Sequence, residues 1–173
     1  MPGSNWNRQD SGGNALKTIQ AKRLNATDFA PFGEVLLLPS APERVYFQDA
    51  PTNLRPHAAA SISTIFKAPS SGWPFKISVL ERHEFSSQTF MPAQVHTWLI
   101  VVAPNNAEGK PDLDRVQAFL ADDSQGITYL PNTWHHELTV FEEPARFHIF
   151  MWRDQTSSDE EFCPVPPFWV TRL

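Results

Sequence analysis

The 173-residue chain has very little cysteine and little glycine. Its single cysteine, Cys163, cannot form an intramolecular disulfide, and a zinc site built on cysteines is not expected. One free thiol is typical of a cytoplasmic protein. With 7 glycines, the chain has no Gly-rich phosphate-binding loop. Cys163 also lies in the acidic stretch 154–163, which disfavours its thiolate, so we do not expect it to be a nucleophile.

Long apolar runs and an excess of positive charge are also missing. The longest apolar run, residues 97–103, has the length of a strand and is far shorter than the ~20 residues of a membrane-spanning helix. The net charge is -5 and no basic stripe is present, so neither a membrane nor a nucleic acid is an expected partner. A small anion is still a suitable ligand, because one Arg or Lys inside a pocket can bind a carboxylate.

Proline is abundant, and the 16 prolines interrupt nearly every candidate helix. We expect only one short helical turn, capped by Thr27 or Asn25 and ended by Pro31. Short alternating runs separated by turns predict an all-β barrel or sandwich. The runs that we expect to be strands are residues 34–38, 59–67, 75–83, 88–92, 96–103, 115–121, 126–131, 136–141 and 145–152.

The size of the chain predicts one domain over residues 15–173. Residues 1–14 are polar and rich in Gly, Ser and Asn, so we expect a flexible tail there. The last ten residues, 164–173, are apolar and include Phe168 and Trp169. We expect this end of the chain to pack on the barrel or on a second subunit.

Two adjacent histidines, His135 and His136, follow a Pro-Asn turn at Pro131, with Gly126 upstream. This spacing approximates the second motif of cupins, in which a strand-borne histidine lines the barrel. Neighbouring strand residues face opposite sides, so only one of the two histidines points inward unless the strand is bulged. A buried, merely hydrogen-bonded histidine beside a solvent-facing one is the alternative interpretation.

A second polar cluster lies upstream in LERHEFSSQTF. Glu81 and His83 share one strand face, Arg82 points to the other side, and Gln88 begins the next strand. Imidazole with an amide is a weaker metal-binding set than imidazole with a carboxylate. The alternative is a surface ion pair of Arg82 and a hydrogen-bonded Gln88.

Several motifs in order resemble the ureidoglycolate lyase family over roughly residues 20–150. The matching stretches are LNATDFAPFGEVL, LERHEFSSQTFMP, WLIVVAP, KPDLDRVQAFLADDSQGITY and NTWHHEL. The resemblance implies a cupin-like β-barrel of jelly-roll type with one or two short helices, and a cytoplasmic homodimer. It further implies cleavage of the ureido acid (S)-ureidoglycolate to glyoxylate and urea in allantoin and purine breakdown. No redox cofactor is required, and a divalent metal such as nickel is compatible with the histidine-rich barrel.

The resemblance and the residue pattern together predict a set of site residues. We expect acid–base or catalytic roles for His136, His135, His83 and Glu81. We expect substrate contacts from Lys67 as the carboxylate anchor, and from Gln88, Tyr129, Arg55 and His57. If a metal is bound, the expected ligands are His83, His96 and His136.

The chain departs from the family pattern at three positions. Lys67 stands where the family often has Arg, Leu130 where a His often follows the family's Tyr, and Glu137 where a Pro follows the histidine pair. A lysine would hold a carboxylate as a point charge rather than as a bidentate fork. A metal-dependent cupin enzyme of other chemistry and a non-catalytic small-carboxylate binding module are the alternative functions.

Overall fold

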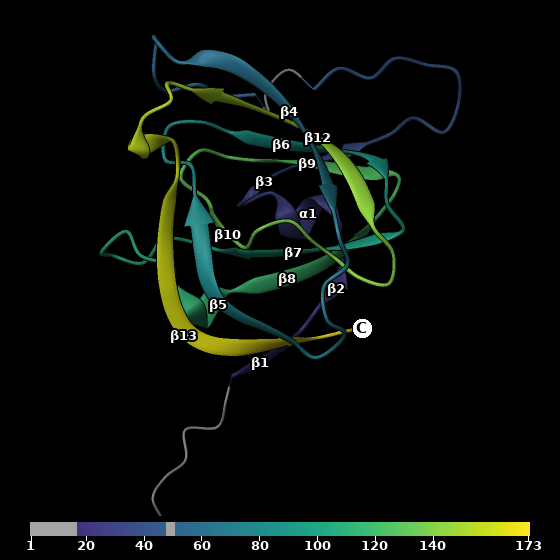
Figure 1. The fold of residues 1–173 in the computed structure, drawn as a ribbon, viewed down its shortest axis with the longest axis vertical. Helices are drawn as coiled ribbons and strands as arrows, with labels where there is room; N and C mark the ends of the chain where they lie inside the picture. Colours follow the sequence, from purple (N-terminus) through teal and green to yellow (C-terminus); the bar gives the residue numbers. More distant parts are fainter. Residues whose placement is uncertain (1–16, 48–50) are drawn as a thin grey trace, which may run out of the picture.

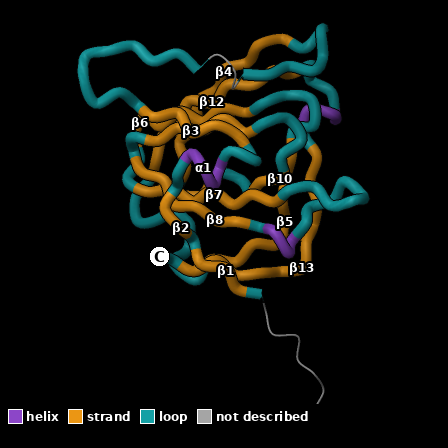
Figure 2. The backbone as a smooth tube through the Cα atoms, turned by 180° about the vertical axis from the view of Figure 1, so that it is seen from behind, coloured by secondary structure: helices purple, strands orange, loops and turns teal. Residues whose placement is uncertain are grey.

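Two β-sheets and one short α-helix make up the computed structural model, which describes residues 17–47 and 51–173 (Figures 1 and 2). The prediction of an all-β barrel with one or two short helices is confirmed. The tail predicted over residues 1–14 lies outside the described residues. Within the described ranges, no helix is long and apolar enough to cross a membrane.

The larger sheet has eight strands in the order β1-β13-β5-β10-β7-β8-β2, and β11 pairs with β7. Its members are β1 (Thr18–Gln20), β2 (Lys22–Arg23), β5 (Phe75–Arg82), β7 (Thr97–Ala103), β8 (Gln117–Asp122), β10 (Trp134–His135), β11 (Thr139–Val140) and β13 (Glu161–Thr171). The smaller sheet has five strands in the order β3-β9-β6-β12-β4. Its members are β3 (Gly33–Leu37), β4 (Ala59–Lys67), β6 (Gln88–Gln94), β9 (Gln125–Tyr129) and β12 (Ala145–Arg153).

The strands are arranged in tiers that enclose two apolar cores. Figures 1 and 2 show the five-stranded sheet on top, β7 and β8 in the middle, and β13 with β1 below. Side chains of β7 point alternately into the two cores. Ile100 and Val102 pack toward the smaller sheet, and Leu99 and Val101 pack toward β13. The central strand therefore carries apolar residues on both faces, which explains its uninterrupted apolar sequence.

The only α-helix of the described residues is α1 (Ala26–Phe29). Asn25 caps it by accepting a hydrogen bond from the Asp28 backbone N–H at 2.9 Å, so Asn25 is the capping residue of the two that were predicted. Phe29 is fully buried and meets the ring of Phe119 edge-on, which anchors the turn to the upper core.

The strand predicted over 136–141 is replaced by two short strands, β10 and β11, with His136 between them. His135 pairs with Val102 of β7 and with Glu81 of β5, so β10 bridges the two strands. This bridge brings the two histidine-bearing segments, which lie some fifty residues apart in the sequence, into direct contact.

The end of the chain packs on the barrel as strand β13, antiparallel to β5 and parallel to β1. Phe168 and Val170 are buried in the lower core. The pairing with β5 shifts in register between Pro164 and Phe168, where prolines cannot donate ladder hydrogen bonds. The acidic stretch 154–163 forms a 3-10 turn, η2 (Ser157–Asp159), and the start of β13. A second turn of this kind, η1 (Leu113–Arg115), precedes β8.

Candidate active site

Three side chains that the sequence separates meet at the junction of β5 and β10. One ligand atom each from Glu81, His83 and His135 lies within 4.8 Å of the others. Glu81 and His83 share a face at the end of β5, as strand alternation predicts, and His135 is the direct neighbour of Glu81 across the ladder. His135 is 1% exposed and His83 is 4% exposed, so this group is shielded from bulk water.

Hydrogen bonds fix the tautomer of both histidines. Nδ1 of His83 lies 2.7 Å from the carbonyl of Asp159, and Nδ1 of His135 lies 2.9 Å from the carbonyl of Thr133. A carbonyl only accepts, so each Nδ1 carries the proton and each neutral ring has its lone pair on Nε2. Neither Nε2 has a hydrogen-bond partner, and both are buried.

The contact between His135 and Glu81 is consistent with this tautomer. His135 Nε2 lies 3.3 Å from a carboxylate oxygen of Glu81, yet the two atoms do not form a hydrogen bond. With the proton on Nδ1, both facing atoms carry lone pairs. The Oε1 atom of Gln88 is also buried without a partner. The ligand atoms of Glu81, His83 and His135 thus lie together, and the two histidine Nε2 atoms have no hydrogen-bond partner, which is the arrangement that a cation would satisfy.

The electrostatics of the group favour a neutral His83 beside an ionised Glu81. Burial, followed by the charge of His135, lowers the pKa of His83 to about 4. Burial acts in the opposite sense on Glu81, but the neighbouring histidines outweigh it and lower the pKa of that carboxyl. A neutral histidine and an ionised glutamate are the forms that coordinate metals.

Tyr129 packs against this group without reaching it through its hydroxyl. Its ring stacks on the His135 imidazole with centroids 4.2 Å apart. Burial, with the charge of Glu81, raises the pKa of the Tyr129 phenol well above its usual range. The predicted site residue Tyr129 thus lies at the site as a rigid wall for His135.

A cavity of about 540 Å³ lies on the His83 side of the group. His83 and Gln88 form part of its wall, and β4 contributes Ser61 and Ser63. The remaining wall comes from β12 and from the segment that follows it. Those residues are Ile149, Met151, Arg153, Thr156, Ser157, Asp159 and Glu160.

A smaller cavity of about 310 Å³ lies on the other side. Glu81 lines it together with His136, Glu137 and Phe162. The Nδ1 atom of His136 faces the Val79 carbonyl at 3.2 Å, and burial lowers the pKa of this histidine. Because Glu81 borders this cavity and His83 borders the larger one, the buried group lies between the two.

Lys67 lies beside the smaller cavity rather than in the wall of the larger one. Its ammonium is 2.7 Å from the Glu137 carboxylate. The two positions were identified separately as departures from the family pattern, and the structure pairs them with each other.

The predicted metal ligands His83, His96 and His136 are not brought together. His96 is exposed in the bend between β6 and β7, and His136 faces the smaller cavity. The physical reason is strand alternation, which turns His135 rather than His136 toward His83. Glu81 and His135 take the two remaining places in the group.

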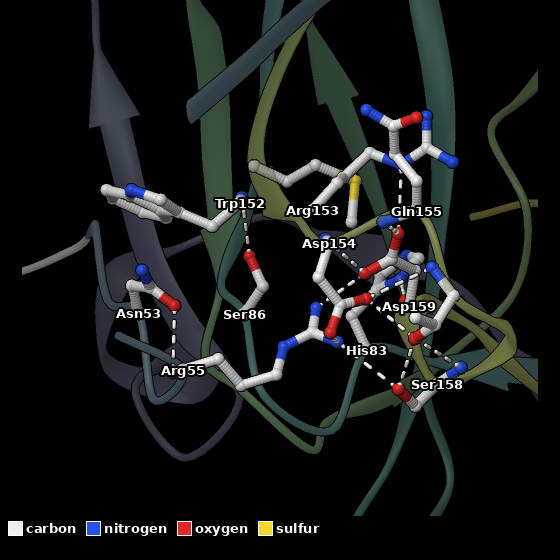
Figure 3. A network of polar contacts seen from close by, with 12 residues as sticks. Asn53, Arg55, His83, Ser86, Trp152, Arg153, Asp154, Gln155, Ser158 and Asp159 are labelled. Carbon is white, nitrogen blue, oxygen red and sulfur yellow. Dashed lines mark hydrogen bonds and ion pairs between the residues drawn. The ribbon is translucent and has the colours of Figure 1, made fainter. Parts of the chain in front are cut away.

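Arg55 and His57 lie behind the larger cavity and line neither cavity. Figure 3 shows the Arg55 guanidinium directed at the carboxylates of Asp154 and Asp159, at 2.7 and 2.5 Å. The ring of His57 is 3.4 Å from Asp154 and largely exposed. The substrate contacts predicted for Arg55 and His57 stay predictions.

Arg153 and Glu160 are wall residues that the sequence did not single out. Partial burial and the charge of Glu81 raise the pKa of the Glu160 carboxyl. Arg153 ends β12, and Glu160 belongs to the acidic stretch 154–163, which has the composition of a solvated loop. Only its folding back over the barrel places it at the site.

A buried Glu–His–His group beside a polar cavity in a β-barrel could hold a metal ion, as sites of metal-dependent enzymes do. Comparison with known proteins gives the particular family. The family model described as ureidoglycolate lyase matches residues 16–171, and the chain belongs to this family.

Curated relatives agree with the family match. A putative ureidoglycolate lyase of Agrobacterium fabrum is 35% identical over 150 residues, covering 87% of this chain and 92% of its own. The ureidoglycolate lyase of Brucella anthropi is 34% identical, covering 85% and 90%. That of Rhizobium etli is 31% identical, covering 88% and 95%. A solved dTDP sugar isomerase from Desulfovibrio desulfuricans G20 has a TM-score of 0.42 and 14% identity over 77% of this chain and 82% of its own, too low to support an inference.

Proposed function

We propose that this protein cleaves ureidoglycolate to glyoxylate and urea at the buried Glu81–His83–His135 group. The reaction moves the hydroxyl proton of the substrate to the departing urea nitrogen while the C–O bond becomes a carbonyl and the C–N bond breaks. It therefore needs a cation for the carboxylate, a proton carrier and a site shielded from water. The observation that carries the proposal is the polar cavity next to buried, unsatisfied ligand atoms in a chain of this family.

We propose that the group holds a divalent metal such as nickel. Glu81, His83 and His135 would be its ligands, with the Gln88 carbonyl oxygen beside them, and their unpartnered atoms fit this role. When bound, such an ion polarises substrate oxygens as a Lewis acid. The chain supplies the fixed tautomers and the shielded cavity that keep the ligand atoms deprotonated and aimed at one point.

Arg153 is the side chain best placed to hold the substrate carboxylate in the larger cavity. It lines that cavity, and its side chain is half exposed at 50%. Its Nε lies 3.4 Å from Asp159, a longer contact than the one that holds Lys67. A guanidinium also binds a carboxylate through two parallel hydrogen bonds. The sequence prediction gave this role to Lys67, whose ammonium is already held by Glu137 at 2.7 Å.

Glu160 is the proton carrier of the proposed reaction. Its carboxylate lines the same cavity as Arg153 and His83 and is electrostatically coupled to Glu81 and His135. A carboxylate with a raised pKa can accept the proton of the substrate hydroxyl and return it to the urea nitrogen. Glu160 then serves as base and afterwards as acid. The proton that it takes from the substrate hydroxyl is the one that it gives to the urea nitrogen, so no second residue is needed.

The direct test is glyoxylate release from racemic ureidoglycolate, corrected for spontaneous breakdown of the substrate. We expect equimolar glyoxylate and urea, with loss of activity after chelation and recovery with nickel. Saturable glyoxylate binding without turnover would replace the enzyme with a carboxylate-binding module. A bound metal with turnover of a different substrate would instead indicate a cupin enzyme of other chemistry.

A homodimer is the assembly that we propose, and the outer face of β4 supports it. Strand β4 lies at the edge of the five-stranded sheet, where Ile62 is 76% exposed and Phe66 is 61% exposed. Ile62 is paired with Phe150 across the ladder, so the apolar surface continues onto β12. A long edge strand with exposed apolar residues favours association unless another surface covers it.

Sedimentation velocity tests the dimer. We expect a dimer for the unaltered chain and a monomer for Ile62→Lys combined with Phe66→Lys. Leu37→Lys is the matched control, because Leu37 is 55% exposed on β3 at the opposite edge of the sheet. A monomer for the unaltered chain would refute the proposal. A cytoplasmic location stays a prediction based on the single cysteine and the family.

A further inference from the structure

A buried ion-pair network lies directly behind His83 (Figure 3). Arg55 is 8% exposed and Asp159 is 5% exposed, and their charged atoms are 2.5 Å apart. The same guanidinium contacts Asp154 at 2.7 Å. Charges buried to this degree are retained only when they are paired and hydrogen-bonded, and they hold a chain segment in one geometry.

The network fixes the position of Asp159 from several directions. Its carboxylate accepts hydrogen bonds from the backbone N–H groups of Asp154 at 3.0 Å and Gln155 at 2.8 Å, in addition to the contact with Arg55. Gln155 has a positive φ of 64°, so the chain makes a tight turn at this point. With its side chain held, Asp159 has its backbone carbonyl directed at Nδ1 of His83, 2.7 Å away.

Because the Asp159 carbonyl accepts a hydrogen bond from Nδ1 of His83, it determines that the lone pair of the neutral ring lies on Nε2. If Asp159 moved, Nδ1 would lose its acceptor, and the proton could occupy Nε2, the atom in the Glu81–His83–His135 group. The contact joins residues 76 positions apart in the sequence, so the link depends on the tertiary network that holds the 154–160 segment in place.

We propose that Arg55 is a positioning residue that acts through Asp159 to keep the Nε2 lone pair of His83 available to a divalent cation. Arg55 touches neither cavity, so its effect is indirect. The functional consequence rests on the proposed function, but the tautomer of His83 does not. A metal-ligating histidine whose Nδ1–H partner is disturbed typically loses about 10- to 100-fold in metal affinity.

The test uses two variants. Arg55→Met removes the charge and keeps much of the length of the side chain. Arg55→Lys keeps the charge and loses the planar guanidinium that contacts two carboxylates at once. The first measurement is the two-bond ¹H–¹⁵N spectrum of the metal-free protein at neutral pH, with the His83 signals assigned from His83→Gln. We expect a protonated Nδ1 and a bare Nε2 in the unaltered chain. In Arg55→Met we expect a mixture of both tautomers, and in Arg55→Lys a smaller change in the same direction.

The second measurement is nickel affinity by calorimetry. We expect about 10- to 100-fold weaker binding for Arg55→Met and an intermediate loss for Arg55→Lys. Arg172→Met is the matched control, because Arg172 forms an exposed pair with Glu142 at 2.7 Å and should change neither readout. If Arg55→Met does not fold, as judged by circular dichroism, Arg55→Lys alone decides the question.

A folded variant with the unaltered tautomer and unaltered nickel affinity would overturn the inference. This outcome is separable from failure of the proposed function. If the unaltered chain releases no glyoxylate but the tautomer responds to Arg55, the positioning role stands and the function falls. If glyoxylate is released and the His83 tautomer is the same in Arg55→Met as in the unaltered chain, the proposed function stands and the positioning role falls.

Discussion

The two cavities beside the Glu81–His83–His135 group differ in which histidine borders them. Each cavity borders a histidine whose buried Nε2 has no hydrogen-bond partner, His136 in the smaller cavity and His83 in the larger. His83 belongs to the group that could hold a metal ion, whereas His136 does not. An unpaired buried atom thus does not identify a site by itself, although leaving it unpaired costs stability unless a ligand completes it. Several ligand atoms that lie together do identify one.

The adjacent histidines give the largest expected contrast between the two sides. We expect His135→Ala to reduce glyoxylate release by about 10⁴-fold, because a bound metal contributes several kcal/mol of transition-state stabilisation. His136→Ala should stay within about tenfold, or about 1.4 kcal/mol. Steady-state kinetics on folded variants measure both. Equal losses, or a larger loss for His136→Ala, would move the reaction to the smaller cavity.

The two carboxylates test proton transfer in the same way. We expect Glu160→Gln to lower kcat by about 10²- to 10³-fold, since a positioned acid–base group contributes within this range. Glu137→Gln, its counterpart across the group, should change kcat by less than about tenfold. A kcat for Glu160→Gln close to that of the unaltered enzyme would remove Glu160 from the chemistry.

The pH dependence of stability separates His83 from ordinary histidines. The unfolded chain takes up a proton near pH 6.5, whereas folded His83 does so only at about pH 4. The unfolded state therefore binds more protons in this window, and the metal-free protein loses up to about 3 kcal/mol as the pH falls through it. Urea unfolding between pH 7 and pH 4 measures this loss. His83→Gln should flatten the profile, and an unchanged slope in that variant would contradict the low pKa.

The two cations give the smallest contrast. We expect Arg153→Met to raise KM by about 10- to 100-fold, because hydrogen bonds to a charged group contribute about 1.5–3 kcal/mol. Lys67→Met should raise KM by less than about fivefold, since an exposed ion pair contributes about 1 kcal/mol or less. The opposite order would restore Lys67 as the carboxylate anchor.

Strand periodicity predicted much of this site. It placed Glu81 and His83 on one face and required that only one histidine of the pair turn inward. Which histidine turns inward depends on the register of β10 against Val102 and Glu81, a long-range pairing that no local pattern encodes.

The position of the 154–160 segment could not have been predicted from the sequence. Its composition is that of a solvated loop, and its position depends on ion pairs with Arg55, about one hundred residues earlier in the chain. The ion pair between Lys67 and Glu137 could not be predicted either, because the two residues lie 70 positions apart in the sequence. Neither residue indicates the other in the sequence, and only the fold shows that they form an ion pair.

Nickel titration of the chelated protein, with glyoxylate release and bound metal measured on the same samples, tests whether the Glu81–His83–His135 group is the site of the reaction. We predict that activity rises in proportion to one metal ion per chain, and that His135→Ala shows neither binding nor activity. Full activity in the metal-free protein, or one bound ion per chain in His135→Ala, would contradict it.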